Sequence, residues 1–378
     1  MDPTSGTEIS AFRSAYQLLI RTARHTVNAL NQDPKNLAIF CQTLSEALED
    51  EDKQIHIIGV ERSRLIGMIF GECLKNIGFS NRVSYLGEIL TRPVKKDDVI
   101  IAITGSGWTK LTTAVLEKIV WKKGKVLTFT GAIDSKAAKL SDAIIQSPMG
   151  YQSQDHIYPF TSKQAPLSPL GNIFELTTMI VGLGVINGVY RGSCTNGFNE
   201  ATTEILRTAE NTFKDLQMSS KLIHFIRSLS DYCIKTEPKV FLYGCGIDSI
   251  IASICSIRFQ SLGMNVLSPN DWRFRREGDL LIALSGSGAS SSTLNFVKSA
   301  KASQMSVYSI CSFPQSLIAL ESDKFIILQG RKEEINPDSL HLLRQEMYLP
   351  KFEYTTSITL EACVTQIAVD LGFSEHAI

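Results

Sequence analysis

The same short glycine-serine loop occurs twice in this chain, each time directly after an apolar run. Residues 103–109 read ITGSGWT, and residues 284–290 read LSGSGAS. The similarity extends to flanking segments, because QIHIIGVERSRLIGMIFGECLKNIGF at 54–79 resembles KVFLYGCGIDSIIASICSIRFQSLGM at 239–264. In both segments a short apolar strand leads through a glycine-containing turn into a helix, so the chain contains an internal repeat.

The two copies keep a nearly constant spacing. Three landmarks recur in the same order, at offsets of 185, 181 and 186 residues: Gly59 with Gly244, Gly105 with Gly286, and Glu175 with Glu361. A unit of this length is much longer than the roughly 20 to 45 residues of a solenoid repeat. Each copy is therefore expected to be a whole domain.

Strands and helices alternate within each copy. In the first copy the apolar runs predict strands near 54–59, 81–86, 98–103, 125–130 and 142–146. Helices are predicted near 62–77, 109–122, 134–140 and 172–191. Continuous apolar strands are typical of a parallel sheet that is covered on both faces. The predicted fold class is therefore α/β, with two doubly wound domains that each contain a five-stranded parallel sheet flanked by helices.

Amphipathic helices are predicted ahead of each sheet, at 8–32, 36–50, 198–216 and 219–235. The stretch RGSCTNGFN at 191–199 is the predicted junction between the copies. The predicted division is a helical segment at 1–34, a first sheet domain at 35–192, a linking helix at 193–217 and a second sheet domain at 218–378. We call the two sheet domains the first half and the second half.

The composition argues against several classes of protein. The 378 residues include 38 Lys plus Arg and 38 Asp plus Glu, so the basic footprint of a nucleic-acid binder is missing. The polar N-terminus does not resemble a signal peptide, and no apolar run approaches 18 residues, so no membrane span is predicted. Eight cysteines without a CxxC pair indicate reduced core thiols in a cytoplasmic protein. Six dispersed histidines make a zinc site unexpected.

The two glycine-serine loops are placed to bind an anion. Ligands of an open parallel sheet bind outside the carboxyl ends of its strands, and each loop follows a predicted strand and begins a helix. Helix N-termini offer backbone N–H groups and a partial positive charge, and Ser or Thr hydroxyls add donors, so phosphate is the natural ligand. The alternative is that these residues only turn the chain and cap the helix. Neither loop is a P-loop and neither half has an intact GxGxxG fingerprint, so neither ATP nor NAD is implied.

Three segments of the first half resemble a known family. GVERS, SYLGEILTRPVKKDDVIIAITGSGWTK and SPLGNIFELTTMI are similar to the sugar isomerase (SIS) domain of 6-phospho-3-hexuloisomerases. The resemblance covers about residues 35–192, and a fainter SIS pattern covers 218–372. It implies a five-stranded parallel sheet, a sugar phosphate ligand and no metal or organic cofactor. Because family members are usually single domains that form oligomers, this chain resembles a fused dimer, and the expected assembly is a homo-oligomer, a dimer of pseudo-dimers.

The resemblance also implies roles for individual residues. Glu175, and Glu361 at the equivalent position of the second half, would move the proton. Glu88, Thr91 and Arg92 would lie at the rim of the pocket. The candidate phosphate-binding residues follow from the loops and the resemblance together: Ser63, Thr104, Ser106, Gly107 and Thr109 in the first half, and Ser249, Ser285, Ser287 and Ser290 in the second.

Two functions remain open at this point. The first is a phosphosugar isomerase that interconverts 3-hexulose 6-phosphate and fructose 6-phosphate through an enediol, which needs one base to carry a proton between neighbouring carbons. The apolar neighbours of Glu175 would raise its pKa and suit it to this task. The second is a non-catalytic regulatory protein that binds a sugar phosphate. Glu61 and Arg64 at glycine positions of the family's first loop, and Thr208 where the family carries a histidine, favour the second function. A purely structural module is disfavoured, because scaffolding does not need two hydroxyl-rich loops.

Overall fold

The computed structural model describes residues 9–87, 92–148, 172–235, 237–330 and 348–372. Its first half contains an all-parallel sheet in the order β2-β1-β3-β4-β5. The strands are β1 (Ile55–Ile58), β2 (Val83–Tyr85), β3 (Val99–Ile103), β4 (Lys125–Thr130) and β5 (Ala143–Gln146). Every residue of β1 and β3 is buried, which explains why these strands are continuous apolar runs.

The second half repeats this sheet. Its parallel strands follow the order β7-β6-β8-β9-β10. They are β6 (Val240–Tyr243), β7 (Val266–Leu267), β8 (Leu280–Ser285), β9 (Ser306–Cys311) and β10 (Lys324–Ile327). The predicted fold class, two five-stranded parallel sheets flanked by helices, is confirmed.

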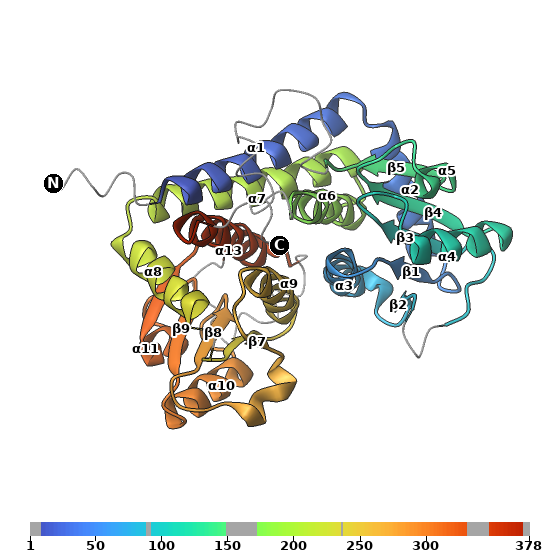
Figure 1. Ribbon diagram of the computed structural model, residues 1–378. Coiled ribbons are helices and arrows are strands. Elements are labelled where there is room, and N and C mark those ends of the chain that lie inside the picture. The colour runs from blue at the N-terminus through green and yellow to red at the C-terminus, as the bar shows by residue number, and fades with distance from the viewer. Residues whose placement is uncertain (1–8, 88–91, 149–171, 236, 331–347, 373–378) are drawn as a thin grey trace, which may run out of the picture.

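Helices cover both faces of each sheet (Figure 1). In the first half they are α2 (Lys35–Glu49), α3 (Arg62–Leu74, continued by the π-helical turn Lys75–Phe79), α4 (Lys110–Trp121) and α5 (Lys136–Lys139). In the second they are α8 (Ser220–Ile234), α9 (Ile247–Ser261), the 3-10 turn Pro269–Phe274, α10 (Ser291–Ala302) and α11 (Leu317–Glu321). In the first half α4 and α5 enclose a small separate cluster of apolar side chains on the outer face, whereas α2 and α3 join the main core on the other.

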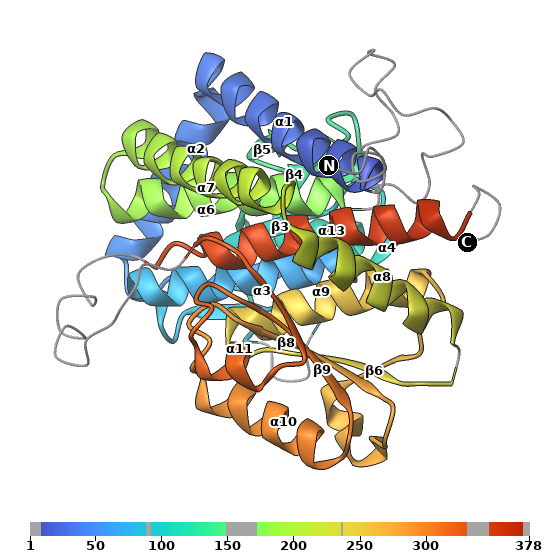
Figure 2. The same ribbon diagram turned by 90° about the vertical axis from the view of Figure 1, so that its left-hand side faces the viewer.

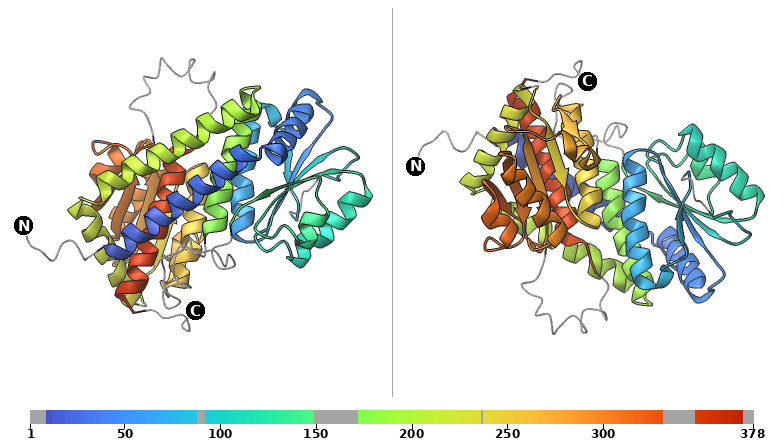
Figure 3. Two further views of the ribbon diagram at one scale, coloured as in Figure 1. Left: turned by 90° about the horizontal axis from the view of Figure 1, so that it is seen from above. Right: turned by 90° about the horizontal axis from the view of Figure 1, so that it is seen from below.

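Two long helices, α6 (Ile173–Tyr190) and α13 (Lys351–Asp370), lie buried between the sheets. Helix α1 (Ser10–Gln32) packs along α13, although the two lie at opposite ends of the chain, and α7 (Cys194–Leu216) packs along α6. The Phe12 N–H donates to Gln366 Oε1 at 3.0 Å. Figure 1 shows α3 and α9 facing each other between the sheets, and Figure 2 shows α13 beside α9. Figure 3 shows α1 and α7 running across both halves. One cluster of buried apolar side chains extends from Ile9 to Ala368, so the two halves share a core.

Helix α6 is long and apolar enough to pass a length and composition test for a membrane span, but 94% of that window is buried inside the protein. Its surface is occupied by α7, α3, α1 and α2. It is therefore a core helix of the fold, which agrees with the expectation from the sequence.

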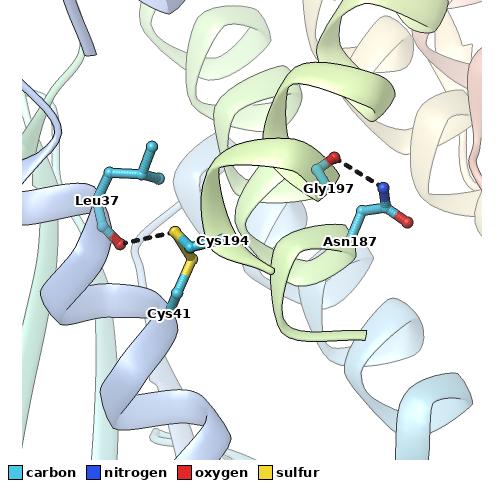
Figure 4. Close-up of a disulfide and its surroundings, with 5 residues drawn as sticks. All are labelled: Leu37, Cys41, Asn187, Cys194 and Gly197. Atoms are coloured by element: carbon cyan, nitrogen blue, oxygen red, sulfur yellow. Dashed lines mark hydrogen bonds between the residues drawn. A yellow bond between two sulfur atoms is a disulfide. The ribbon is translucent and has the colours of Figure 1, made fainter. Parts of the chain in front are cut away.

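Cys41 of α2 and Cys194 at the start of α7 form a disulfide (Figure 4), so the expectation that all eight cysteines are reduced was wrong for this pair. The predicted junction at 191–199 is also shorter than expected, because α7 begins at Cys194. The tight turn from α6 into α7 brings the two sulfurs together. A side chain at Gly188 would come within 2.9 Å of the Cys194 carbonyl oxygen, and the Asn187 amide donates to the Gly197 carbonyl at 2.8 Å. The two cysteines lie 153 residues apart and no spacing motif marks them, so their pairing could not be predicted from the sequence.

Reduction of the disulfide should lower the free energy of unfolding by about 2 to 4 kcal/mol, because the cross-link closes a long loop in the unfolded chain. Denaturant unfolding with and without reductant measures this, and a Cys41→Ser/Cys194→Ser variant should match the reduced protein. A thiol reagent under denaturing, non-reducing conditions should label six cysteines. Labelling of all eight would show that the pair is not oxidised.

Candidate functional site

The loops after β1 and β3 flank the point where the strand order reverses. From β1 the chain continues to the outer strand β2, and from β3 it continues through β4 to β5 on the other side. In the second half, β6 and β8 occupy the same positions. Ligands of doubly wound proteins bind in the crevice at this reversal, at the carboxyl edge of the sheet. Both glycine-serine loops lie at that edge, directly after β3 and β8.

The two glycine-serine loops have the same backbone geometry. Gly107 has φ of 67° and Gly288 has φ of 63°, a conformation that favours glycine. A Cβ atom at Gly107 would lie 1.9 Å from Ser135 Oγ, and one at Gly288 would lie 2.1 Å from Ser316 Oγ. Each loop is therefore fixed against the serine that caps the next short helix. The duplication seen in the sequence therefore extends to the contacts of equivalent glycines and serines in the two loops.

The hydroxyls of these loops divide into an exposed and a buried set. Ser106 and Ser287 are exposed at the loop tips, and Thr104 and Ser285 are buried behind them. Thr109 and Ser290 stand at the N-cap positions of α4 and α10, but neither side chain makes a capping hydrogen bond. The capping alternative therefore does not account for these two hydroxyls, which remain candidates for a ligand.

The first turns of α3 and α9 differ between the halves. Ser63 is buried in the first turn of α3, whereas the equivalent position of α9 holds a buried carboxylate, Asp248. The neighbouring Ser249 is exposed and donates to the Gly246 carbonyl at 2.7 Å. A carboxylate at this crevice opposes a phosphate by charge repulsion. The two halves therefore differ in charge at this position, Ser63 in the first and Asp248 in the second.

Glu175 lies in the first turn of α6 and is only 7% exposed. The start of α6 is held against the start of α3, because Arg62 donates to the side-chain oxygen of Asn172, the N-cap residue, at 2.7 Å. Burial raises the pKa of Glu175, the Arg62 guanidinium opposes that shift, and the Glu361 carboxylate adds to it. This places a carboxyl group of raised pKa beside the helix start that carries Ser63.

Glu361 is the eleventh residue of α13, so the expectation that it is equivalent to Glu175 was wrong. Glu175 is the third residue of α6, in IFELTT, and the third residue of α13, in KFEYTT, is the buried Glu353. Both oxygens of Glu361 accept hydrogen bonds. Arg258 of α9 donates to both of its oxygens at 2.9 to 3.1 Å, and the Asn172 amide donates to Oε2 at 2.7 Å. A cavity lined by these three residues has a free volume of only about 10 Å³, which holds at most one water molecule. Glu175 and Glu361 therefore differ both in position and in surroundings, and of the two only Glu361 is held by a bidentate arginine.

Of the three pocket-rim candidates the structure describes only Arg92, which it does not bring to this crevice. Arg92 is exposed and donates to Gln54 at 2.9 Å, directly before β1 and hence at the amino edge of the sheet. Glu88 and Thr91 lie outside the described residues. The family resemblance places Arg92 at the pocket, and the sequence does not show that it lies at the opposite edge of the sheet.

Three residues that surround Glu175 and Glu361 were not predicted from the sequence: Arg62, Asn172 and Arg258. Arg62 and Asn172 lie within three residues of the candidates Ser63 and Glu175, so proximity in the sequence could have found them. Arg258 lies on a different helix in the other half, and nothing in its neighbourhood distinguishes it from a surface arginine.

The model of the SIS domain matches residues 48–174 and 234–342, so the chain belongs to the SIS domain family. An uncharacterized protein of Aeropyrum pernix is 30% identical over 177 residues, which cover 45% of this chain and 82% of the relative. The 3-hexulose-6-phosphate isomerase of Bacillus subtilis is 27% identical over 164 residues, covering 43% of this chain and 85% of that enzyme. These relatives therefore correspond to a single half.

Solved structures resemble the whole tandem arrangement. Tagatose-6-phosphate ketose/aldose isomerase from Escherichia coli superposes with a TM-score of 0.58 at 14% identity, covering 98% of this chain and 95% of that one. The C-terminal domain of glucosamine-fructose-6-phosphate aminotransferase from Francisella tularensis gives 0.60 at 13% identity, covering 94% and 97%. At these identities the likeness concerns the fold alone.

Glu61, the N-cap residue of α3, has a strained backbone conformation. Its φ of 53° and ψ of −123° match those of Gly246, 64° and −130°, at the equivalent position of α9. A side chain in this conformation costs about 1 to 3 kcal/mol.

Glu61→Gly should stabilise the protein by about 1 kcal/mol, after the extra freedom of glycine in the unfolded chain is subtracted. Denaturant unfolding measures the gain. Glu61→Ala is the matched control, since it removes the carboxylate and keeps the strained conformation, and it should give no gain. Equal stability of all three proteins would contradict the assignment of strain.

Proposed function

We propose that this chain is a phosphosugar isomerase that interconverts 3-hexulose 6-phosphate and fructose 6-phosphate, with its working site in the first half. The observation that carries the proposal is Glu175, a buried carboxyl group of raised pKa beside the start of α3. The names of the 3-hexulose-6-phosphate isomerases among the relatives support the choice of reaction. We further propose that the protein needs no cofactor and works in the cytoplasm, where the Cys41–Cys194 disulfide would be an exception to the usual reduced state of thiols.

In the proposed reaction the sugar phosphate lies in the crevice of the first half. The phosphate contacts the N–H groups and hydroxyls of the glycine-serine loop and the first turn of α3, where Ser106 and Ser63 lie. The predicted phosphate role of Thr104, Gly107 and Thr109 belongs to the same proposal. In the second half, Asp248 makes Ser249, Ser285, Ser287 and Ser290 a less favourable set for a dianion.

Glu175 acts as the base. It removes the proton from C2 of the 3-ketose, while the carbonyl oxygen on C3 gains a proton, which gives an enediol across C2 and C3. Return of the carried proton to C3 and loss of a proton from the oxygen on C2 give the 2-ketose. The positive charge of Arg62 stabilises the negative charge that develops on these oxygens. Glu361, whose oxygens are all occupied, is not proposed as a second base.

The regulatory alternative is supported by one observation. Glu61 is exposed at the first loop, and its carboxylate lies next to the turn in which the phosphate would bind. It would weaken phosphate binding without preventing it. The two functions differ in whether the bound sugar turns over.

Glu175→Gln should lower kcat about 100- to 10,000-fold, because the general base is lost, and leave the affinity for fructose 6-phosphate within a few fold of native. Ser106→Ala should instead raise KM. The assay supplies D-arabino-hex-3-ulose 6-phosphate and follows fructose 6-phosphate through a coupled dehydrogenase. No turnover by the native chain, together with heat stabilisation by fructose 6-phosphate, would support the regulatory alternative.

The pH dependence of kcat should report Glu175. A base must be ionised to accept a proton, so kcat should rise with pH through its raised pKa and then level off. Glu361→Gln removes a nearby negative charge that contributes to raising the pKa of Glu175, so the acid limb should move to lower pH. Glu204→Gln on α7 is the control and should leave the limb in place. A limb that stays fixed or moves upward in Glu361→Gln would contradict the assignment.

A further inference from the structure

Four polar side chains form a continuous hydrogen-bonded chain between the two halves. Arg62 of α3 donates to Asn172 Oδ1 at 2.7 Å, Asn172 donates to Glu361 Oε2 at 2.7 Å, and Arg258 of α9 donates to both Glu361 oxygens. Asn172, Glu361 and Arg258 are each less than a tenth exposed. The chain thus links Arg62, which we propose contacts the reacting oxygens, to two residues of the second half.

This series of hydrogen bonds fixes the orientation of the Asn172 side chain. An arginine can only donate and a carboxylate can only accept, so the amide satisfies both partners in a single orientation, with oxygen toward Arg62 and nitrogen toward Glu361. Asn172 is the N-cap residue of α6, and Glu175 follows one turn later. Holding the cap therefore also holds the turn that carries Glu175.

The four hydrogen-bonded residues are not left over from the duplication. By position in the equivalent helices, Arg62 corresponds to Ile247 and Arg258 to Cys73. Asn172, the N-cap residue of α6, corresponds to Pro350, the N-cap residue of α13. Glu361, the eleventh residue of α13, corresponds to Leu183 of α6, so none of the four residues has a like counterpart. The four side chains therefore belong to the contact between the halves and not to the duplicated domain.

Stability alone does not explain a buried pair of this kind. Removing two charges from water costs several kcal/mol per ion, and apolar replacements of buried ion pairs are often equally stable or more stable. What such a pair supplies is a defined position for its neighbours, here Asn172 and Arg62. A displacement of about 1 Å at a reacting group can cost about 100-fold in rate.

We propose that Glu361 and Arg258 of the second half are positioning residues for the site of the first half, acting through Asn172 and Arg62. This inference rests on the proposed function. It gives the second half a role in catalysis that requires no ligand of its own.

The test replaces the pair with apolar side chains in Arg258→Met/Glu361→Met, which removes the acceptor of Asn172 without leaving a buried charge. Lys351→Met/Glu204→Met is the matched control, because that ion pair also joins α13 to another helix, α7, but does not contact Asn172. We expect the first variant to unfold at a denaturant concentration close to that of the native protein, with kcat about 10- to 100-fold lower and KM within threefold. The control should keep native kcat.

A conservative variant of Glu361 tests whether the hydrogen bond to Asn172 is what supports kcat. Glu361→Gln keeps an oxygen that can accept from Asn172, so it should retain more of the native kcat than the apolar pair does. Native kcat in Arg258→Met/Glu361→Met, or an equal loss in the control, would overturn the proposal.

A second readout does not depend on turnover. In the native protein both polar ends of the Asn172 amide are bonded, so its side-chain NH₂ signal in a ¹⁵N NMR spectrum should exchange slowly with solvent. The signal should exchange faster in the apolar pair and not in the control. Lack of turnover in the native protein would count against the proposed function alone, whereas an unchanged Asn172 signal in the apolar pair would count against the positioning role.

Discussion

The burial of α6 and α13 between two sheets is the constraint on which the rest of the structure depends. A helix enclosed on all sides must satisfy every polar group that it carries. Helix α13 does this for four of its hydroxyls, since Thr355, Ser357, Thr359 and Thr365 each donate to the carbonyl of the residue four positions earlier. The carboxyl groups cannot do so, and their compensation by arginines from α3 and α9 creates the charged cluster between the halves.

The fold could be predicted from the sequence because its signals are local. Strands such as β3 are uninterrupted apolar runs, and each is followed by glycines that the backbone conformation requires. The phosphate candidates Ser63 and Ser106 were found for the same reason. Arg258 and the disulfide partner of Cys41 could not be found, because each acts across a distance in the sequence that only packing closes. A charge looks the same in a sequence whether it is solvated or enclosed.

The two halves have kept their backbone and changed their chemistry. The glycine-serine loops remain superposable in their contacts, down to the serine beneath each second glycine, Ser135 and Ser316. In contrast, Asp248 stands where the first half has Ser63, and Arg258 where it has Cys73. When the two copies of a duplicated domain share one core, a copy whose chemistry has changed is still retained. The other copy needs its apolar surface in order to bury its own.

The packing of α1 against α13 has a consequence for how the chain is made. The bond between Phe12 and Gln366 joins residues 354 positions apart, so the packing of α1 is completed only after α13 has been synthesised. Until then the apolar face of α1 is exposed, and contacts of such long range form slowly. Removal of either helix would therefore leave an apolar face of the other uncovered.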